Sequence, residues 1–185
     1  MTKLLSRRHG VIGFVLLLVF LLLLVFIAFQ QGWLVAFHMK DSQAMWPTIN
    51  TDDLVIAETV TNRFSEPKPG QMVIFDSKGI SGLEELHGED PPWLYVQRLV
   101  AVPGNQIQIS SGELHVDNII WEPVEWDGQI EPGPFLLESV LTEVPQDCFF
   151  VIADHYSVGE DSRYWGWVPQ ENLVARVLWV FRANE

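Results

Sequence analysis

The chain has 185 residues, 48% of them hydrophobic and 19% charged, which suits one globular domain with an appended apolar segment and argues against disorder. The formal net charge is -13, yet the first 32 residues contain Lys3, Arg7 and Arg8 and no acid, so removing their +3 leaves -16 on the rest. Because nucleic-acid binding needs lysine and arginine against the phosphates, so acidic a domain excludes nucleic acid as a partner.

An uncharged apolar run extends from Val11 to Phe29. As a helix it would span about 28 Å, close to the ~30 Å core of a bilayer. A cleavable signal peptide has a shorter core and a small-x-small site after it, which this chain does not offer. We therefore predict a cytoplasmic basic segment over residues 1–10, an uncleaved transmembrane anchor over residues 11–32 and an extracytoplasmic domain over residues 33–185. The chain would then cross the cytoplasmic (inner) membrane once.

The remainder of the chain consists of short β-branched and aromatic runs separated by Pro and Gly turns, a pattern that predicts strands. The expected strands are Trp33–His38, Asp53–Ala57, Met72–Phe75, Leu94–Val102, a hairpin within Ile107–Ile120, Phe149–Ala153 and Leu173–Phe181. Ser77–Pro92 is rich in Gly, Ser, acids and Pro, so we expect a surface loop or hairpin tip there. With no helical period outside the anchor, the sequence predicts an all-β domain, a compact barrel or two packed sheets.

Metal and disulfide chemistry are not expected. The sequence has no Cys/His cluster for a metal and no Gly-rich loop before a helix for a phosphate group, so no cofactor is predicted. Cys148 is the only cysteine, which rules out an intrachain disulfide. Because Cys148 precedes an apolar strand, we expect a buried, unreactive thiol.

Four motifs follow one another along the domain. They are Ser42–Ile49 (Ser-Gln-Ala-Met-Trp-Pro-Thr-Ile), Gly70–Phe75 (Gly-Gln-Met-Val-Ile-Phe), Tyr95–Asn105 (Tyr-Val-Gln-Arg-Leu-Val-Ala-Val-Pro-Gly-Asn) and Ala153–Pro169, which contains Asp-Ser-Arg-Tyr. In order and spacing they resemble the four boxes of the type I signal peptidases (leader peptidases). The resemblance implies a coiled β-sheet or barrel domain on a single transmembrane helix. It also implies a serine endopeptidase that removes signal peptides from exported preproteins.

The chemistry of that family implies three residues that this chain lacks. In the family a serine of the first box attacks the peptide bond, a buried lysine of the third box is the general base, and a serine of the last box orients the lysine. The matching positions here are Ala44, Gln97 and Gly159. A methyl group has no nucleophilic oxygen, and a carboxamide takes no proton near neutral pH. Loss of a nucleophile alone lowers turnover about a million-fold. A single engineered Ser→Ala exchange would leave Gln97 and Gly159 unexplained.

The residues kept from the four boxes are those that build shape. Ser42 matches the serine that helps to stabilise the oxyanion. Asp161 and Arg163 are expected to form a charged, hydrogen-bonded pair, and Gly166 suits a close backbone approach. Residues expected to bind a ligand are Gln43, Met45, Trp46 and Pro47.

The sequence thus predicts a membrane-anchored, catalytically silent homologue of signal peptidase. It would bind a signal-peptide-like or pilin-like exported segment, or a membrane-complex subunit in secretion or pilus assembly. One alternative is an active processing peptidase, including the conjugation type, that uses a dyad such as Ser42 and His155. Another is a structural subunit without a groove function.

Overall fold

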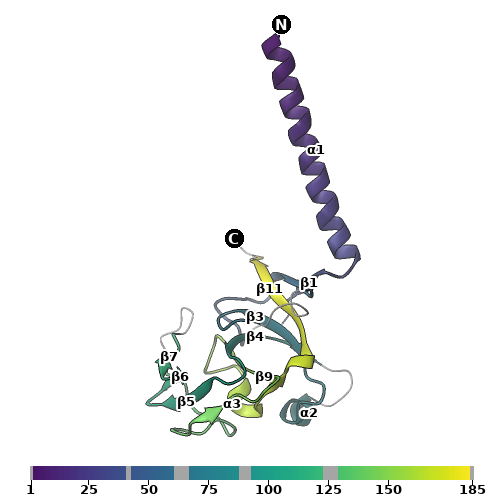
Figure 1. The fold of residues 1–185 in the computed structure, drawn as a ribbon. Coiled ribbons are helices and arrows are strands. Elements are labelled where there is room, and N and C mark those ends of the chain that lie inside the picture. The colour runs from purple at the N-terminus through teal and green to yellow at the C-terminus, as the bar shows by residue number, and fades with distance from the viewer. Residues whose placement is uncertain (1, 41–42, 61–66, 88–92, 123–128, 184–185) are drawn as a thin grey trace. The chain divides into compact units, whose positions relative to one another are not determined.

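The computed structural model describes residues 2–40, 43–60, 67–87, 93–122 and 129–183, and in its first helix the side chains from residue 12 onward. The chain divides into two compact units, Met1–Val35 and Ala36–Glu185. The first unit is formed mainly by helix α1 (Thr2–Gln30), drawn in purple in Figure 1. Within it, Ile12–Gln30 is long and apolar enough to cross a membrane, and none of this stretch is buried in the protein. The helix is therefore compatible with the predicted anchor.

The second unit is built on a seven-stranded sheet with the strand order β1-β2-β11-β3-β4-β9-β10. Its strands are β1 (Leu34–His38), β2 (Leu54–Glu58), β3 (Met72–Asp76), β4 (Leu94–Ala101), β9 (Cys148–Ile152), β10 (Val168–Pro169) and β11 (Leu173–Phe181). Strand β11 pairs with β2 through its second half and with β3 through its first half, and its register shifts in both ladders. Such irregularities bend a strand, and the sheet curls around β11 in Figure 1.

A smaller sheet has the order β7-β6-β5-β8. It contains β5 (Gln106–Ser110), β6 (Glu113–Val116), β7 (Ile119–Ile120) and β8 (Thr142–Glu143). The predicted hairpin is confirmed, since β5 and β6 are antiparallel neighbours and β7 continues the meander. Both tight turns have positive φ at their two central residues, Ser111-Gly112 and Asp117-Asn118, as two-residue hairpin loops require. Short strands in two sheets confirm the predicted β-rich fold.

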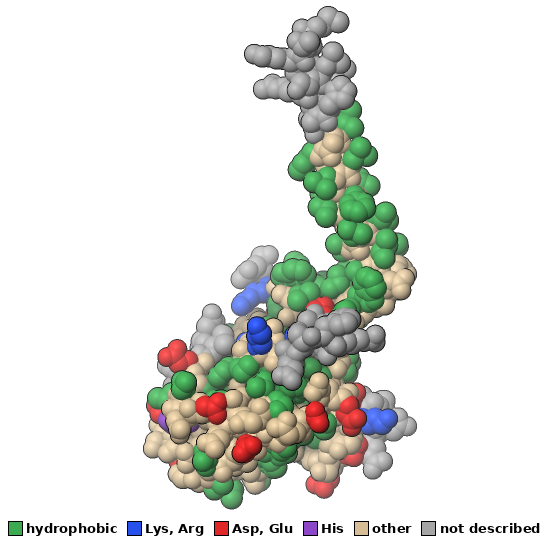
Figure 2. Space-filling view, in the orientation of Figure 1, with side chains coloured by type: hydrophobic (Ala, Val, Ile, Leu, Met, Phe, Trp, Pro, Cys, Tyr) green, Lys and Arg blue, Asp and Glu red, His purple; other side chains and the backbone are tan. Residues whose placement is uncertain are grey.

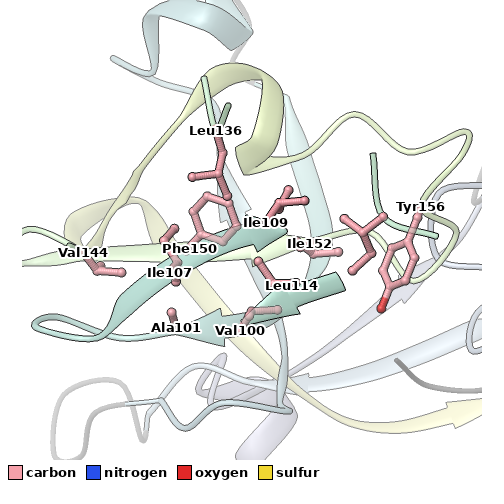
Figure 3. Close-up of a cluster of buried hydrophobic side chains, with 11 residues drawn as sticks. Val100, Ala101, Ile107, Ile109, Leu114, Leu136, Val144, Phe150, Ile152 and Tyr156 are labelled. Carbon is pink, nitrogen blue, oxygen red and sulfur yellow. The ribbon is translucent and has the colours of Figure 1, made fainter. Parts of the chain in front are cut away.

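The core fills both faces of β9. Phe150 and Ile152 join a buried cluster that also takes Ile107 and Ile109 from β5 (Figure 3). The alternate residues Phe149 and Val151 point to the other face of β9, where a second cluster lies. Because successive side chains of a strand alternate, burial on both sides explains the uninterrupted apolar run of β9. By contrast, acidic side chains are spread over the face of the domain shown in Figure 2.

The expected loop over Ser77–Pro92 is wrong for its central part, which forms helix α2 (Ser81–His87). Leu83 of this helix is fully buried in the second cluster. Gly82 packs so closely that a Cβ there would lie 2.5 Å from the Cβ of Trp165. Two turns with one core-facing leucine show no helical period, and a tertiary contact holds this helix in place. A second short helix, α3 (Ser162–Trp165), and a 3-10 turn (Gln170–Asn172) also escaped the sequence pattern.

Candidate functional site

The site begins at the turn after β1. The N–H of Ile49 donates to the carbonyl of Met45 at 2.8 Å, and both side chains are buried against Val55 of β2. A cis peptide bond joins Trp46 to Pro47. With Met45 only 1% exposed, the turn is pinned to the core, and the half-buried Ala44 lies at its edge.

The fold brings close together the three positions that the motif resemblance singles out, Ala44, Gln97 and Gly159. The N–H of His155 donates to the carbonyl of Ala44 at 2.9 Å, so the last motif lies against the first. A methyl group on Gly159 would lie 3.4 Å from the Cβ of Ala44. The side-chain amide of Gln97 donates from Nε2 to the carbonyl of Glu160 at 2.6 Å, next to Gly159. Positions separated by more than 100 residues thus meet in one place.

Ala44, Gln97 and Glu160 border a pocket of about 320 Å³, here called the Gln97 pocket. Six of its lining side chains are apolar: Met39, Ala44, Met45, Leu94, Val96 and Val158. Tyr95, Gln97 and Glu160 complete the lining. The pocket therefore lies between the segment that follows β1, the first half of β4 and the loop that follows β9.

Strand β4 is paired differently along its two halves. Its ladder with β3 runs from Leu94 to Arg98, whereas its ladder with β9 covers Arg98–Ala101. The half that borders the Gln97 pocket thus precedes the point where β9 joins. Among the ladders of the described strands, this half of β4 is paired with β3 alone.

Gln97 has one satisfied and one unsatisfied polar atom. Its side chain is buried, with 2% of the residue exposed, and Nε2 is bonded to Glu160. Its Oε1 has no hydrogen-bond partner within the part of the chain that the structure describes. A buried acceptor without a donor costs about 1–3 kcal/mol. This oxygen is enclosed by the protein, with less than 1 Å² of its surface accessible.

Tyr95 is the one hydroxyl-bearing residue among those lining the Gln97 pocket. Burial, reinforced by the negative charge of Glu160, raises its pKa to about 12. The phenol therefore stays protonated at neutral pH and is a poor nucleophile there.

The shift at Tyr95 predicts a loss of stability at alkaline pH. The unfolded chain releases the Tyr95 proton near its ordinary pKa of about 10, whereas the folded chain holds it to about 12. The folded state then binds more protons, so its stability falls as pH rises from about 10 to about 12. Urea unfolding at pH 8 and pH 11 measures the loss. Tyr95→Phe should reduce the pH dependence, and an equal dependence in both proteins would contradict the assignment.

Two charged pairs hold the motifs around the pocket. Arg98 donates from Nε and Nη2 to the two carboxylate oxygens of Asp154, both at 2.6 Å. The hydroxyl of Thr48 donates to the same carboxylate, so the first, third and last motifs are tied together. Arg163 and Asp161 form a second bidentate pair at 2.8 Å, with both residues 0% exposed. Bidentate pairs of this kind fix geometry as well as charge.

Gly166 ends α3 with φ 94°, a conformation that favours glycine. A Cβ at this position would lie 2.7 Å from the ring of Phe135. The close approach expected at Gly166 is thus made to an aromatic ring.

His155 lies in a second pocket of about 380 Å³ that is also lined by Gln43, Trp46, Asn50 and Thr51. Its Nδ1 is 3.3 Å from the carbonyl oxygen of Gln43, and its ring centroid is 5.5 Å from that of the 44% exposed Trp46. His155 is not among the residues lining the Gln97 pocket. Ser42, the other member of the alternative dyad, lies outside the described residues.

The expected binding residues are thus divided between the two pockets. Gln43 and Trp46 line the pocket of His155, while the buried Met45 lines the Gln97 pocket. Pro47 lines neither of these two.

Cys148 is half-buried and lines a separate cavity of about 870 Å³. Burial, together with the negative charge of Asp147, raises the pKa of its thiol. Within the described ranges, no group of three or more His, Cys, Asp or Glu side chains is placed to hold a metal ion.

Sequence reasoning missed the part that Ala153 plays. A Cβ on Gly159 would overlap the Cβ of Ala153 and would lie 3.2 Å from the carbonyl oxygen of His155. The signal peptidase box that the last motif resembles has glycine at the position of Ala153 and serine at the position of Gly159. That reciprocal exchange of size was visible in the sequence, but only the structure shows that the two positions touch.

Comparisons with known proteins agree with the motifs. The family model described as "Signal peptidase, peptidase S26" matches residues 11–182. A Synechocystis protein named "Probable signal peptidase I-1" is 28% identical over 140 residues, which is 76% of this chain and 67% of that protein. The Arabidopsis thaliana "Thylakoidal processing peptidase 1, chloroplastic" is 32% identical over 73% of this chain but only 38% of its own length. A Staphylococcus aureus protein named "Inactive signal peptidase IA" is 21% identical over 85% of this chain and 84% of its own.

Proposed function

The chain belongs to the signal peptidase family, peptidase S26, and from that premise we propose that it is a member that binds an exported segment without cutting it. The observation that carries the proposal is that Ala44 and Gln97 line one pocket and that Gly159 lies beside Ala44. At the three positions that carry the reactive groups in the family, this chain supplies a methyl group, a carboxamide and a hydrogen atom.

Cleavage of a peptide bond requires a nucleophile and a group that takes its proton. Ala44 offers no oxygen, and Gln97 uses its amide nitrogen as a donor to Glu160. The methyl group of Ala153 leaves no space for a side chain at position 159, where the family has the serine that orients the base. The loss thus extends to the supporting residues. The S. aureus relative, whose name calls it inactive, is a precedent for a silent member of this family.

Binding is supported by features that do not depend on the lost groups. The first half of β4 borders the pocket before β9 joins the sheet, which suits the addition of an extended segment as a strand. The apolar lining would accept small apolar side chains between main-chain hydrogen bonds. The bound segment would come from an exported preprotein, a pilin-like protein or a subunit of a membrane complex.

The anchor helix would place this binding site outside the cytoplasm. Lys3, Arg7 and Arg8 precede the apolar stretch of α1, and basic residues favour the cytoplasmic side of a membrane. The domain would then face the compartment into which signal peptides are delivered.

The proposal predicts binding without cleavage. Purified full-length chain in detergent is incubated with a preprotein, and a photo-crosslinking amino acid is placed at Val96, which lines the Gln97 pocket. We expect a crosslinked product and no processed product. The control position is Ile119 on β7, which is 73% exposed and should give no crosslink.

Two other outcomes would contradict the proposal. Processing that disappears in Ser42→Ala would replace the proposal by the active dyad. Equal crosslinking from Val96 and Ile119 would argue against a groove and for a structural subunit.

A further inference from the structure

Glu160 is the one charged residue among the described residues that line the Gln97 pocket. Its side chain is exposed, and within the part of the chain that the structure describes its carboxylate forms no ion pair. The negative charge of Glu160 helps to raise the pKa of Tyr95, which places the carboxylate near the phenol in the same pocket lining. A carboxylate in this position can receive a cation from a bound molecule.

The lining of the pocket contains no positive charge that would neutralise this carboxylate. Gln97 is neutral at the position where the signal peptidase family has a lysine. Arg98, the next residue, is paired with both carboxylate oxygens of Asp154. The chain after its anchor is also strongly acidic, so the surroundings do not repel a basic ligand. The pocket therefore attracts a cation and has none of its own.

The walls of the pocket suit the stem of a long basic side chain. Six of the nine lining residues are apolar, among them Met39 and Val96. Lysine and arginine lay their methylene groups along apolar surface and keep the charged end in water. Leu94 and Val158 are 52% and 51% exposed, so the pocket lies at the surface, where a charged end stays hydrated. An apolar wall that ends at a carboxylate matches both parts of such a side chain.

We propose that one residue of the segment bound in the Gln97 pocket is lysine or arginine, and that its charged end pairs with the carboxylate of Glu160. The inference rests on the proposed function and names the chemistry of its ligand. Side chains of an extended segment alternate between two faces, so this basic residue and the nearest small apolar residue on the same face are two positions apart. Glu160 is thus a specificity-determining residue.

The test uses the full-length chain in micelles of a non-ionic detergent and fluorescein-labelled octapeptides built from alanine and serine. Lysine or norleucine, which has an unbranched stem without the charge, is placed at each position in turn, and Kd is measured by fluorescence anisotropy. We expect one position at which lysine binds about five-fold more tightly than norleucine, the effect of one exposed ion pair. In Glu160→Gln this preference should vanish, while the norleucine peptides bind as before.

The matched control is Glu171→Gln, the same exchange at an exposed acid that lines the separate cavity of about 870 Å³. It should keep the preference for lysine. In the parent protein, raising NaCl from about 20 mM to about 500 mM should weaken the preference, because salt screens an exposed pair.

Failure of this inference is distinguishable from failure of the proposed function. If the parent protein binds the peptides but prefers lysine at no position, the inference is wrong and the proposed function stands. The same holds if Glu160→Gln and Glu171→Gln reduce the preference equally, since the attraction then belongs to the acidic domain as a whole. If the parent protein binds none of the peptides, both are wrong.

Discussion

Replacing Arg163 by methionine is expected to destabilise the domain by about 3–5 kcal/mol, the cost of leaving one member of a buried ion pair without its partner. Asp161 and Arg163 are both 0% exposed. The guanidinium also donates to the carbonyls of Glu131, Tyr156 and Gly159. Its removal therefore leaves a buried carboxylate without its counter-charge and three carbonyl groups without their side-chain donor. Urea unfolding followed by tryptophan fluorescence measures the change.

The matched control for this exchange is Arg182→Met, which removes the same group from an exposed position and should change stability by less than about 0.5 kcal/mol. A double variant, Asp161→Leu with Arg163→Met, should be less destabilised than the sum of its single variants, because the two residues share one interaction. A fully additive result would mean that Arg163 acts through its carbonyl contacts alone.

Gly159→Ser is expected to destabilise the domain by about 3 kcal/mol, the upper end of the usual cost of overpacking. The new Cβ would overlap that of Ala153, and the space is closed further by the carbonyl of His155. Ala153→Gly removes the obstructing methyl group, so the double variant should recover most of the loss. Thermal unfolding of the parent, both single variants and the double variant completes the cycle.

The single Ala153→Gly variant is the internal control, and we expect it to be mildly destabilised because it only leaves a small void. A double variant no more stable than Gly159→Ser would show that the obstruction comes from the backbone instead. Recovery in the double variant would show that a serine at position 159 requires a glycine at position 153.

Much of the fold follows from local patterns. Runs of β-branched residues and turn signals are enough to place the longer strands and the hairpin of β5 and β6, but not β8 or β10. The length and composition of α1 are likewise compatible with the predicted membrane-crossing segment. The order of strands in the larger sheet does not follow, because β11 enters between β2 and β3 through long-range pairing. Helix α2 was missed for a related reason, since the contact of Gly82 with Trp165 leaves no periodic signal.

The sequence alone names the residues of the candidate site, but it does not show which of them are in contact. The motifs alone single out Ala44, Gln97 and Gly159. The overlap of residues 153 and 159 and the orphaned oxygen of Gln97 depend on distances between side chains that no motif encodes. Trp46 is exposed, whereas Trp165 is buried against Phe75 in the second core cluster, and the motifs alone do not separate the two.

The divided pairing of β4 has a consequence for how such a protein can change over time. A guest strand laid beside Leu94, Val96 and Gln97 would be recognised by amide and carbonyl groups that every residue possesses. Exchanging a lysine for a glutamine there alters none of those groups. In such an architecture, peptide binding and catalysis would depend on different groups. A member of the family could then lose catalysis and still bind a peptide.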